Sequence, residues 1–243
     1  MTLVLVKNSP SDDLRRRIAD AGALIFDVDG TMAETEEIHR EAFNEAFVAV
    51  GVDWHWGRRI YKELLRVAGG KERIRAFDQM RRSGPPLSDA VVARLHRIKT
   101  ERFAALMAAK GCALRPGVQA LLEAAWKREQ RVAIATTTTR VNIDALLAPV
   151  LGTDWETKFA AVVAADDVAR KKPAPDVYLE VLSQLDLPAA SCIAIEDSGN
   201  GLLAAIRAGV PVLITRSLYF HDDTFNGALG VLEDLGELFV SGT

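Results

Sequence analysis

The stretch ALIFDVDGT, residues 23–31, joins an apolar run to two aspartates and a glycine. A short, continuous apolar run is typical of a strand buried in a parallel sheet. Residues two apart in a strand project to the same side, so Asp27 and Asp29 can reach one cleft at the carboxyl end of the strand. Gly30 allows the backbone to turn sharply directly after them. The stretch therefore predicts a buried strand that ends in a pair of carboxylates.

Four further apolar runs predict the remaining strands of the sheet, at residues 131–136, 160–165, 192–197 and 211–215. The segments between them repeat apolar residues at helical spacing. Alternating strands and helices indicate an α/β fold with a doubly wound parallel sheet. Ligands of such sheets bind beyond the carboxyl ends of the strands. Five polar side chains are expected at this edge: Asp27, Thr136, Asp166, Glu196 and Asp197.

A helical block interrupts this alternation. Residues 34–113 read as one helix after another, without a convincing strand. We expect them to form a separate α-helical cap domain, inserted into an α/β core domain of residues 1–33 and 114–243. The two crossings between these domains, at residues 32–35 and 114–117, are the predicted hinges.

The composition excludes several classes of protein. Of the 243 residues, 49% are hydrophobic, which argues against a disordered chain. The net charge is −3 and no long run of Lys or Arg is present, so nucleic acid is not an expected partner. No apolar run approaches the roughly 20 residues that span a bilayer, so no membrane association is expected either.

The N-terminus and the cysteines bear on localisation. The first ten residues lack the basic segment and the cleavage site of a signal peptide. Cys112 and Cys192 have no metal-binding spacing and are expected to stay reduced. We therefore expect the protein in the cytoplasm, or in the plastid stroma if the organism is eukaryotic. A monomer is the expected state, although no feature of the sequence specifies the number of chains. Residues 12–20 predict either a short surface helix or a frayed extension.

The paired aspartates favour a metal site. Two carboxylates this close repel each other, and a cation between them relieves the repulsion. Mg²⁺ suits carboxylate and carbonyl oxygens and keeps water molecules that a phosphate can replace. For the pair Asp27 and Asp29 alone, however, two solvated side chains in a turn are the simpler interpretation.

Three other segments stand beside predicted strands, as FDVDGT (26–31) does: VAIATTTT (132–139), KKPAPD (171–176) and AIEDSGNG (194–201). Together the four segments resemble the four motifs of the haloacid dehalogenase superfamily of phosphotransferases, in the order of that family. Each alone is a weak or moderate signal, but four in order are a strong one. The helical block is similar to the α-helical cap of the β-phosphoglucomutase-like branch.

The resemblance implies a phosphatase that works through a phosphoaspartate. Asp27 would attack the phosphorus, and Asp29 would protonate the leaving alcohol and then activate water. A dehalogenase lacks this second aspartate, because halide leaves without a proton. The residues implied at the Mg²⁺ site are Asp27, the carbonyl group of Asp29, Asp197, and Glu196 as the group that orients the metal's water molecules.

Lys172 and Thr136 are the implied partners of the phosphoryl group. Lys172 would neutralise its oxygens and the nucleophile, although the neighbouring Lys171 could take this place. Thr136 would donate its hydroxyl to a phosphoryl oxygen, or it could instead cap the end of the strand, and the sequence leaves both open. Thr137 and Thr138 are expected to bind substrate beside it.

Residues of the cap are expected to select the substrate. Glu36 and His39 lie one helical turn apart, so both could face the cleft and bind sugar hydroxyls, or face solvent instead. Gly70, Lys71 and Arg73 lie at a predicted helix start, where free amides and two cations could bind a second phosphate. A solvated helix end is the alternative interpretation of these three residues.

The amino-acid sequences of several segments resemble one particular branch of this family. Residues 27–47, DWHW (53–56), GGKERI (69–74) and ATTTT (135–139) are similar to the branch that removes the 1-phosphate of xylulose-1,5-bisphosphate. That bisphosphate inhibits rubisco, so the branch serves the Calvin cycle. A sugar bisphosphate is therefore the expected substrate.

Two other functions compete with this one. A phosphoglucomutase-like isomerase shares all four motifs and differs in passing the phosphoryl group to a second sugar hydroxyl rather than to water. A phospho-receiver module also pairs carboxylates at strand ends around Mg²⁺. Receivers have no helical insertion and carry the phosphoryl-accepting aspartate on a later strand, so the helical block and Asp29 argue against one.

Overall fold

The computed structural model describes residues 11–81 and 84–240, and it contains a six-stranded sheet in which all neighbouring strands are parallel. The strands are β1 (Ala23–Phe26), β2 (Arg131–Ala135), β3 (Ala161–Val163), β4 (Cys192–Glu196), β5 (Val212–Thr215) and β6 (Gly230–Leu232). Their spatial order is β3-β2-β1-β4-β5-β6, which is the order of a doubly wound sheet. The predicted fold class is confirmed.

Five of these strands are the five predicted apolar runs, with slightly narrower bounds. β6 was not predicted, because it has three residues and only Leu232 among them is buried. A strand this short, with one buried side chain, carries no periodic signal.

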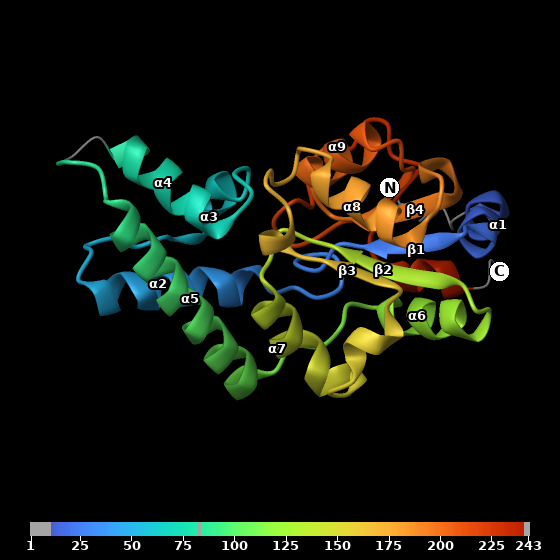
Figure 1. Cartoon of the computed structure of the whole chain (residues 1–243), viewed down its shortest axis with the longest axis horizontal. Helices are drawn as coiled ribbons and strands as arrows, with labels where there is room; N and C mark the ends of the chain where they lie inside the picture. The colour runs from blue at the N-terminus through green and yellow to red at the C-terminus, as the bar shows by residue number, and fades with distance from the viewer. Residues whose placement is uncertain (1–10, 82–83, 241–243) are drawn as a thin grey trace, which may run out of the picture.

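Helices cover both faces of the sheet (Figure 1). Those of the core are α1 (Asp12–Asp20), α6 (Val118–Lys127), α7 (Arg140–Leu151), α8 (Asp176–Leu185) and α9 (Gly199–Arg207), with 3₁₀ turns at Trp155–Lys158, Ala165–Asp167, Ala189–Ser191 and Leu235–Phe239. In β1, Ala23 and Ile25 belong to the apolar cluster that includes α8 and α9, whereas Leu24 and Phe26 belong to the cluster of α6 and α7. Because β1 is buried on both faces, it must be apolar throughout.

α1 resolves the alternative left open near the N-terminus. The hydroxyl of Ser11 accepts a hydrogen bond from the amide of Leu14 at 3.2 Å and caps the helix. Leu14 and Ile18 are buried in the same cluster as α6 and α7. The segment is therefore a packed helix rather than a frayed extension. The signal-peptide expectation concerned residues 1–10, which lie outside the described part of the chain.

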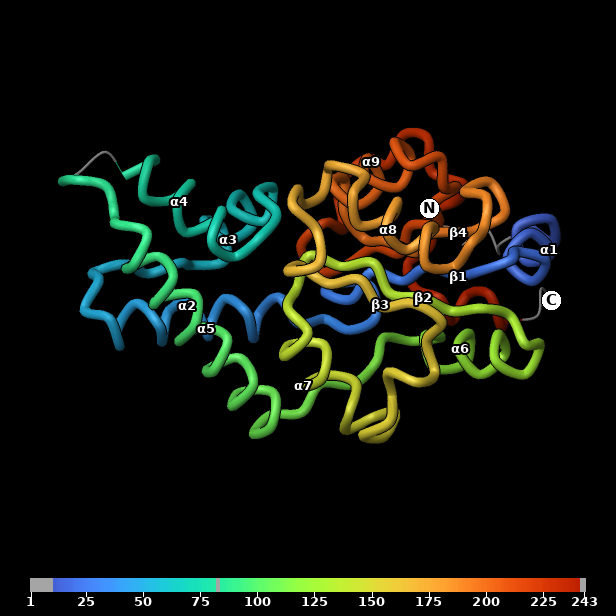
Figure 2. Tube along the Cα trace, viewed as in Figure 1, coloured from blue at the N-terminus to red at the C-terminus, as the bar shows by residue number. Residues whose placement is uncertain are grey.

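Four helices between β1 and β2 form a second lobe, the cap (Figure 2): α2 (Glu36–Val50), α3 (Arg58–Leu64), α4 (Gly70–Arg81) and α5 (Asp89–Lys110). The described residues of this insertion, 34–81 and 84–113, contain no strand. Phe43 of α2 packs on Trp56, with ring centroids 4.6 Å apart, and Phe47 packs on Trp54. The lobe thus has an aromatic core of its own, while the domain boundaries stay a prediction.

The two crossings between core and cap lie side by side. The amide of Arg115, in the second crossing, donates to the carbonyl oxygen of Met32, in the first, at 2.8 Å. The buried guanidinium of the same arginine donates to four acceptors: the carbonyl oxygens of Gly30, Arg216 and Glu233 and the hydroxyl of Thr215. Arg115 therefore joins the two crossings through its backbone amide and fixes them to the core, next to the loop that carries Asp27, through its side chain.

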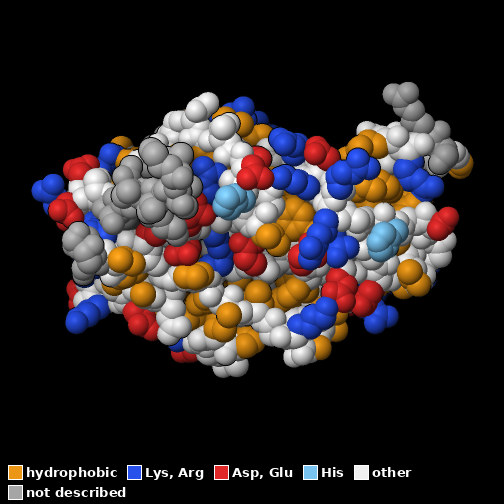
Figure 3. Space-filling model, turned by 180° about the vertical axis from the view of Figure 1, so that it is seen from behind, with side chains coloured by type: hydrophobic (Ala, Val, Ile, Leu, Met, Phe, Trp, Pro, Cys, Tyr) orange, Lys and Arg blue, Asp and Glu red, His pale blue; other side chains and the backbone are white. Residues whose placement is uncertain are grey.

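The surface of the two lobes carries charges of both signs. On the face shown in Figure 3, basic and acidic side chains are interspersed over core and cap rather than segregated by sign. Within the described residues, none of the helices combines the length and the apolar character needed to cross a membrane.

Candidate active site

Three carboxylates meet where β1 and β4 end. These strands are neighbours, with Phe26 opposite Ile195, so the residues that follow them lie side by side. Asp27, Glu196 and Asp197 are all buried, and each offers an oxygen within 4.8 Å of the other two. The structure thus brings together the side chains of three of the four residues predicted at the metal site.

This cluster is well suited to a hard divalent cation. Burial raises the pKa of Glu196 to about 7, and it raises the pKa values of Asp27 and Asp197 above their ordinary range as well. Oε2 of Glu196 is buried and has no hydrogen-bond partner among the described residues. Gly30 leaves room for Asp197, since a Cβ at Gly30 would lie 2.1 Å from its Oδ2. Clustered oxygens, of which one is unpartnered, and excess negative charge fit Mg²⁺.

Lys172 lies between two of these carboxylates. Its Nζ donates to Oδ1 of Asp27 and Oε1 of Glu196, both at 2.6 Å, and to the carbonyl oxygen of Ala135 at 2.8 Å. Burial acts to lower the pKa of Lys172, but the charges of the two carboxylates outweigh it and raise the pKa above its ordinary value. Lys171 donates instead to two backbone carbonyl groups of the preceding segment. The structure therefore places Lys172, and not Lys171, beside Asp27.

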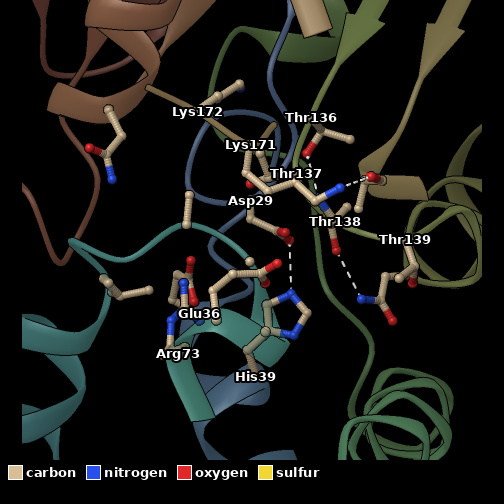
Figure 4. Close-up of a pocket in the computed structure, with 18 of the residues that line it drawn as sticks. Asp29, Glu36, His39, Arg73, Thr136, Thr137, Thr138, Thr139, Lys171 and Lys172 are labelled. Carbon is tan, nitrogen blue, oxygen red and sulfur yellow. Dashed lines mark hydrogen bonds and ion pairs between the residues drawn. The ribbon is translucent and has the colours of Figure 1, made fainter. Parts of the chain in front are cut away.

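The loop after β2 brings Thr136, Thr137 and Thr138 to the lining of the same pocket (Figure 4). Oγ1 of Thr136 accepts a hydrogen bond from the amide of Thr138 at 3.3 Å. The hydroxyl of Thr138 accepts one from the side-chain amide of Asn142 at 2.8 Å. The two interpretations of Thr136 are compatible, because its oxygen can cap the strand while its hydrogen stays available to a phosphoryl oxygen.

The side chain of Asp29 points toward the cap (Figure 4). Its Oδ1 accepts a hydrogen bond from the hydroxyl of Thr35 at 2.6 Å and lies 3.1 Å from Nε2 of His39. Nδ1 of His39 lies 2.7 Å from the buried ammonium group of Lys99. Because an ammonium group only donates, Nδ1 accepts and Nε2–H donates to Asp29. Lys99, His39 and Asp29 thus form a chain of hydrogen bonds with one direction.

The charges along this chain agree with that direction. Burial lowers the pKa of Lys99 to about 8 and, together with the charge of Lys99, lowers the pKa of His39. Burial acts to raise the pKa of Asp29, but His39, Thr35 and Lys99 outweigh it and hold this pKa well below its usual range. Near neutral pH, Lys99 is therefore charged, His39 is neutral and Asp29 is ionised. Both nitrogens of His39 are engaged, so its contact with sugar hydroxyls stays a prediction.

The cap closes the pocket opposite the carboxylates, around a cavity of about 190 Å³. Glu36 accepts a hydrogen bond from the hydroxyl of Tyr61 at 2.7 Å, and Arg73 donates to the same hydroxyl at 3.1 Å. Arg73 also donates to the backbone carbonyl oxygen at the end of α3 at 3.2 Å and to one in the α3–α4 connection at 3.4 Å. Gly70 and Lys71 line the pocket too, and Lys71 makes no hydrogen bond or ion pair within the described residues. Arg73 is thus tied into the cap, whereas Lys71 is the freer cation.

Two residues of α5 that line the pocket were not predicted, His96 and Lys99. The buried residues of α5 recur at helical spacing, and Lys99 takes one of these positions, so a lysine on an apolar face was the signal for it. The ring of His96 packs on Gly70, where a Cβ would lie 2.7 Å from two ring atoms. Burial, with the nearby charges of Lys99 and Lys71, lowers the pKa of His96 to about 4. This ring is therefore a neutral part of the cap wall.

Comparisons with known proteins agree with this geometry. The family of haloacid dehalogenase-like hydrolases matches residues 21–209. The chain is 51% identical to the plasmid-encoded protein CbbY of Cupriavidus necator over 219 residues, which cover 88% of this chain and 86% of that protein. It is 50% identical to CbbY of Rhodobacter capsulatus over 213 residues, covering 88% and 93% of the two chains. A crystal structure of a CbbY mutant from Rhodobacter sphaeroides in complex with xylulose-1,5-bisphosphate has a TM-score of 0.85 and 45% identity, covering 89% of this chain and 96% of that one. The chain therefore belongs to the haloacid dehalogenase-like hydrolases, as its four motifs predicted, and it is an enzyme of the phosphatase type.

Proposed function

We propose that the protein is a Mg²⁺-dependent phosphatase that removes the 1-phosphate of xylulose-1,5-bisphosphate through a phosphoaspartate at Asp27. The position of Asp27 carries the proposal, since Lys172 lies 2.6 Å from it and the carboxylates of Glu196 and Asp197 lie beside it. The similarity to a CbbY that was crystallised with this bisphosphate supports the choice of substrate. Because xylulose-1,5-bisphosphate inhibits rubisco, its removal would support the Calvin cycle.

The chemistry divides into two displacements at phosphorus. In the first, a carboxylate oxygen of Asp27 bonds to phosphorus while the bond from phosphorus to the sugar oxygen breaks, and Asp29 gives that oxygen a proton. In the second, Asp29 takes a proton from a water molecule that attacks the acyl phosphate, which releases orthophosphate and restores Asp27. Asp27, Asp197 and Glu196, with the carbonyl group of Asp29, would hold Mg²⁺, which supplies neutralisation of the phosphoryl charge.

The lowered pKa of Asp29 fits the second of these steps directly. An ionised carboxylate is the form that accepts a proton from water. The first step needs the protonated form, and a phosphate dianion entering the pocket favours it, because a nearby negative charge raises the pKa of a carboxyl group. The chain from Lys99 through His39 holds Oδ1 of Asp29 in place. It leaves Oδ2 without a hydrogen bond to the described residues, available to the leaving oxygen.

We further propose that one chain works alone, in the cytoplasm. Core and cap of a single chain line the whole pocket, so no second chain is needed to complete the site. Both cysteines of the sequence are free thiols, which suits a reducing compartment.

A substrate panel tests the proposed function. Purified protein is assayed for orthophosphate release from sugar monophosphates and bisphosphates, including xylulose-1,5-bisphosphate and β-glucose 1-phosphate, with Mg²⁺ and with excess chelator. We expect the fastest release from the ketopentose bisphosphate, loss of activity in chelator, recovery with Mg²⁺ and poor replacement by Ca²⁺, whose looser coordination suits the in-line geometry badly. Isomerisation of the hexose phosphate without phosphate release would favour the mutase alternative, and full activity after exhaustive chelation would exclude the metal.

A further inference from the structure

Tyr178 lies behind the carboxylate cluster and outside the lining of the pocket. It is on α8, its side chain is completely buried, and its hydroxyl donates to Oε1 of Glu196 at 2.5 Å. The ammonium group of Lys172 lies 5.4 Å from the centre of its ring. Glu196 is the only hydrogen-bond partner of this hydroxyl within the described residues. Because buried polar groups are normally hydrogen-bonded, the contact between Tyr178 and Glu196 is a specific one.

The two carboxylate oxygens of Glu196 differ in their hydrogen-bond partners. Oε1 accepts hydrogen bonds from both Tyr178 and Lys172, whereas Oε2 is buried with no partner in the described parts of the chain. Gly201 confines the carboxylate from another direction, since a Cβ at that position would lie 1.9 Å from Oε2. The carboxylate is thus held by one oxygen and leaves the other to a ligand, which is how residues behind a metal site orient the groups that bind it.

We propose that Tyr178 is a positioning residue that fixes Glu196 so that Oε2 is available to the cation of the carboxylate cluster, and that it thereby sets the affinity for that cation. This inference rests on the metal site of the proposed function. Tyr178 touches neither the cavity nor Asp27, so its influence on the reaction passes through Glu196. Lys172 cannot replace it, because Lys172 also binds Asp27 and Ala135 and is not free to follow the carboxylate.

The test compares Tyr178→Phe with Tyr219→Phe in the full-length protein. Tyr219 is the matched control, because it is also a buried tyrosine whose hydroxyl donates to a glutamate, Glu37, but away from the carboxylate cluster. Mn²⁺ is used as the probe, and the free ion is counted by electron paramagnetic resonance during a titration. Loss of a hydrogen bond behind a metal ligand weakens metal affinity by about 10- to 100-fold, so we expect that change in the apparent Kd of Tyr178→Phe. Tyr219→Phe should bind Mn²⁺ as the wild type does.

A second measurement separates positioning from a general loss of structure. The Mg²⁺ concentration for half-maximal rate should rise in Tyr178→Phe, while kcat at saturating Mg²⁺ stays close to that of the wild type. Phenylalanine keeps the ring in its packing, and circular dichroism checks that the variant is folded. Unchanged Mn²⁺ affinity in Tyr178→Phe, or an equal loss in Tyr219→Phe, would overturn the inference and leave the proposed function intact. A wild type that binds no Mn²⁺ would overturn the metal site itself.

Discussion

The two walls of the pocket differ in how firmly their charged side chains are held. On the core side, Lys172 binds both Asp27 and Glu196, and all three side chains are buried, so their geometry exists before a substrate arrives. On the cap wall, Lys71 is exposed and has no partner within the described residues. Groups that act on the reacting phosphate work best when they are preorganised, that is, held in place before the substrate binds. A charge without a partner is instead suited to binding an additional group of the ligand. Changes among the core groups should therefore affect every phosphate ester, whereas changes at the unpartnered cation of the cap, Lys71, should affect only some of them.

Removal of the nucleophile should have the largest effect. Asp27→Asn keeps the size of the side chain but cannot form the acyl phosphate, so we expect turnover to fall by about three orders of magnitude or more on any substrate. Phosphate release in steady state measures it, and Asp20→Asn, on the exposed end of α1, is the control. A rate near that of the wild type would exclude Asp27 as the phosphoryl carrier.

The next largest effect should come from Lys99, which joins the two walls. Lys99→Met removes the donor to His39 and loosens the hold on Asp29, so kcat should fall about 100-fold on bisphosphate and monophosphate alike, as loss of proton transfer does. The pKa of Lys99 is lowered to about 8, so the wild type should lose activity as the pH rises through that value, because a neutral lysine no longer donates a charged hydrogen bond.

The pH profile of kcat decides whether Lys99 is responsible. Lys99→Met should lack this alkaline decline, whereas Lys71→Ala should keep it. A decline of the same shape in Lys99→Met would assign it to another group and would contradict the proposed chain.

The cap wall should show a smaller effect that depends on the substrate. Lys71→Ala removes one charge-assisted contact to a second phosphate, which is worth about 1.5–3 kcal/mol, so kcat/KM on the bisphosphate should fall roughly 10- to 100-fold. p-Nitrophenyl phosphate cannot reach the cap, and its kcat/KM should change much less. Lys62→Ala, on α3 and outside the pocket lining, is the control.

Arg73 gives a less specific result than Lys71. Because Arg73 also donates to Tyr61, to the end of α3 and to the α3–α4 connection, Arg73→Ala should combine the lost charge with a loosened cap. Equal losses of Lys71→Ala on both substrates, or no loss on either, would mean that Lys71 is only a solvated side chain at a helix end.

The difference between the walls also explains what the sequence could predict. Asp27, Thr136 and Asp197 directly follow strands, and the edge of a parallel sheet brings such residues together whatever the loops do. Lys172 lies in the long connection between β3 and α8, so the resemblance of its motif predicted it and the sheet pattern did not. The five predicted strands and the helical insertion could be predicted for the same reason, since their apolar patterns are local. β6 could not, because only one of its three residues is buried, whereas β3, which is equally short, is buried throughout and lies in a continuous apolar run.

Residues that act through distant partners could not be found in this way. Lys99 reaches His39 across 60 residues of sequence, and only the packing of α5 on α2 brings them together. In the sequence, Tyr178 is an ordinary residue on the apolar face of a helix, and only the structure shows that its hydroxyl donates a hydrogen bond to Glu196. The role of Arg73 also depends on packing, because the pattern at residues 69–74 showed a cation at a helix start but not its contacts with Tyr61.

Closure of the cap should produce the smallest effect and tests how the walls meet. The side-chain amide of Asn200, at the start of α9, donates to the carbonyl oxygen of Arg66 in the cap at 2.9 Å. This hydrogen bond is between neutral groups and exposed to water, so its loss should cost about 1 kcal/mol. Asn200→Ala should therefore raise KM for the bisphosphate about fivefold and leave kcat almost unchanged. Asn226→Ala, in a loop of the core, is the control.

Small-angle scattering of Asp27→Asn, which would hold the bisphosphate without turning it over, should show a smaller radius of gyration with substrate than without it. Because Arg115 fixes both crossings to the core, the rotation should take place in the segments on the cap side of it. Identical scattering with and without substrate, together with an unchanged KM in Asn200→Ala, would mean that the cap does not gate the site.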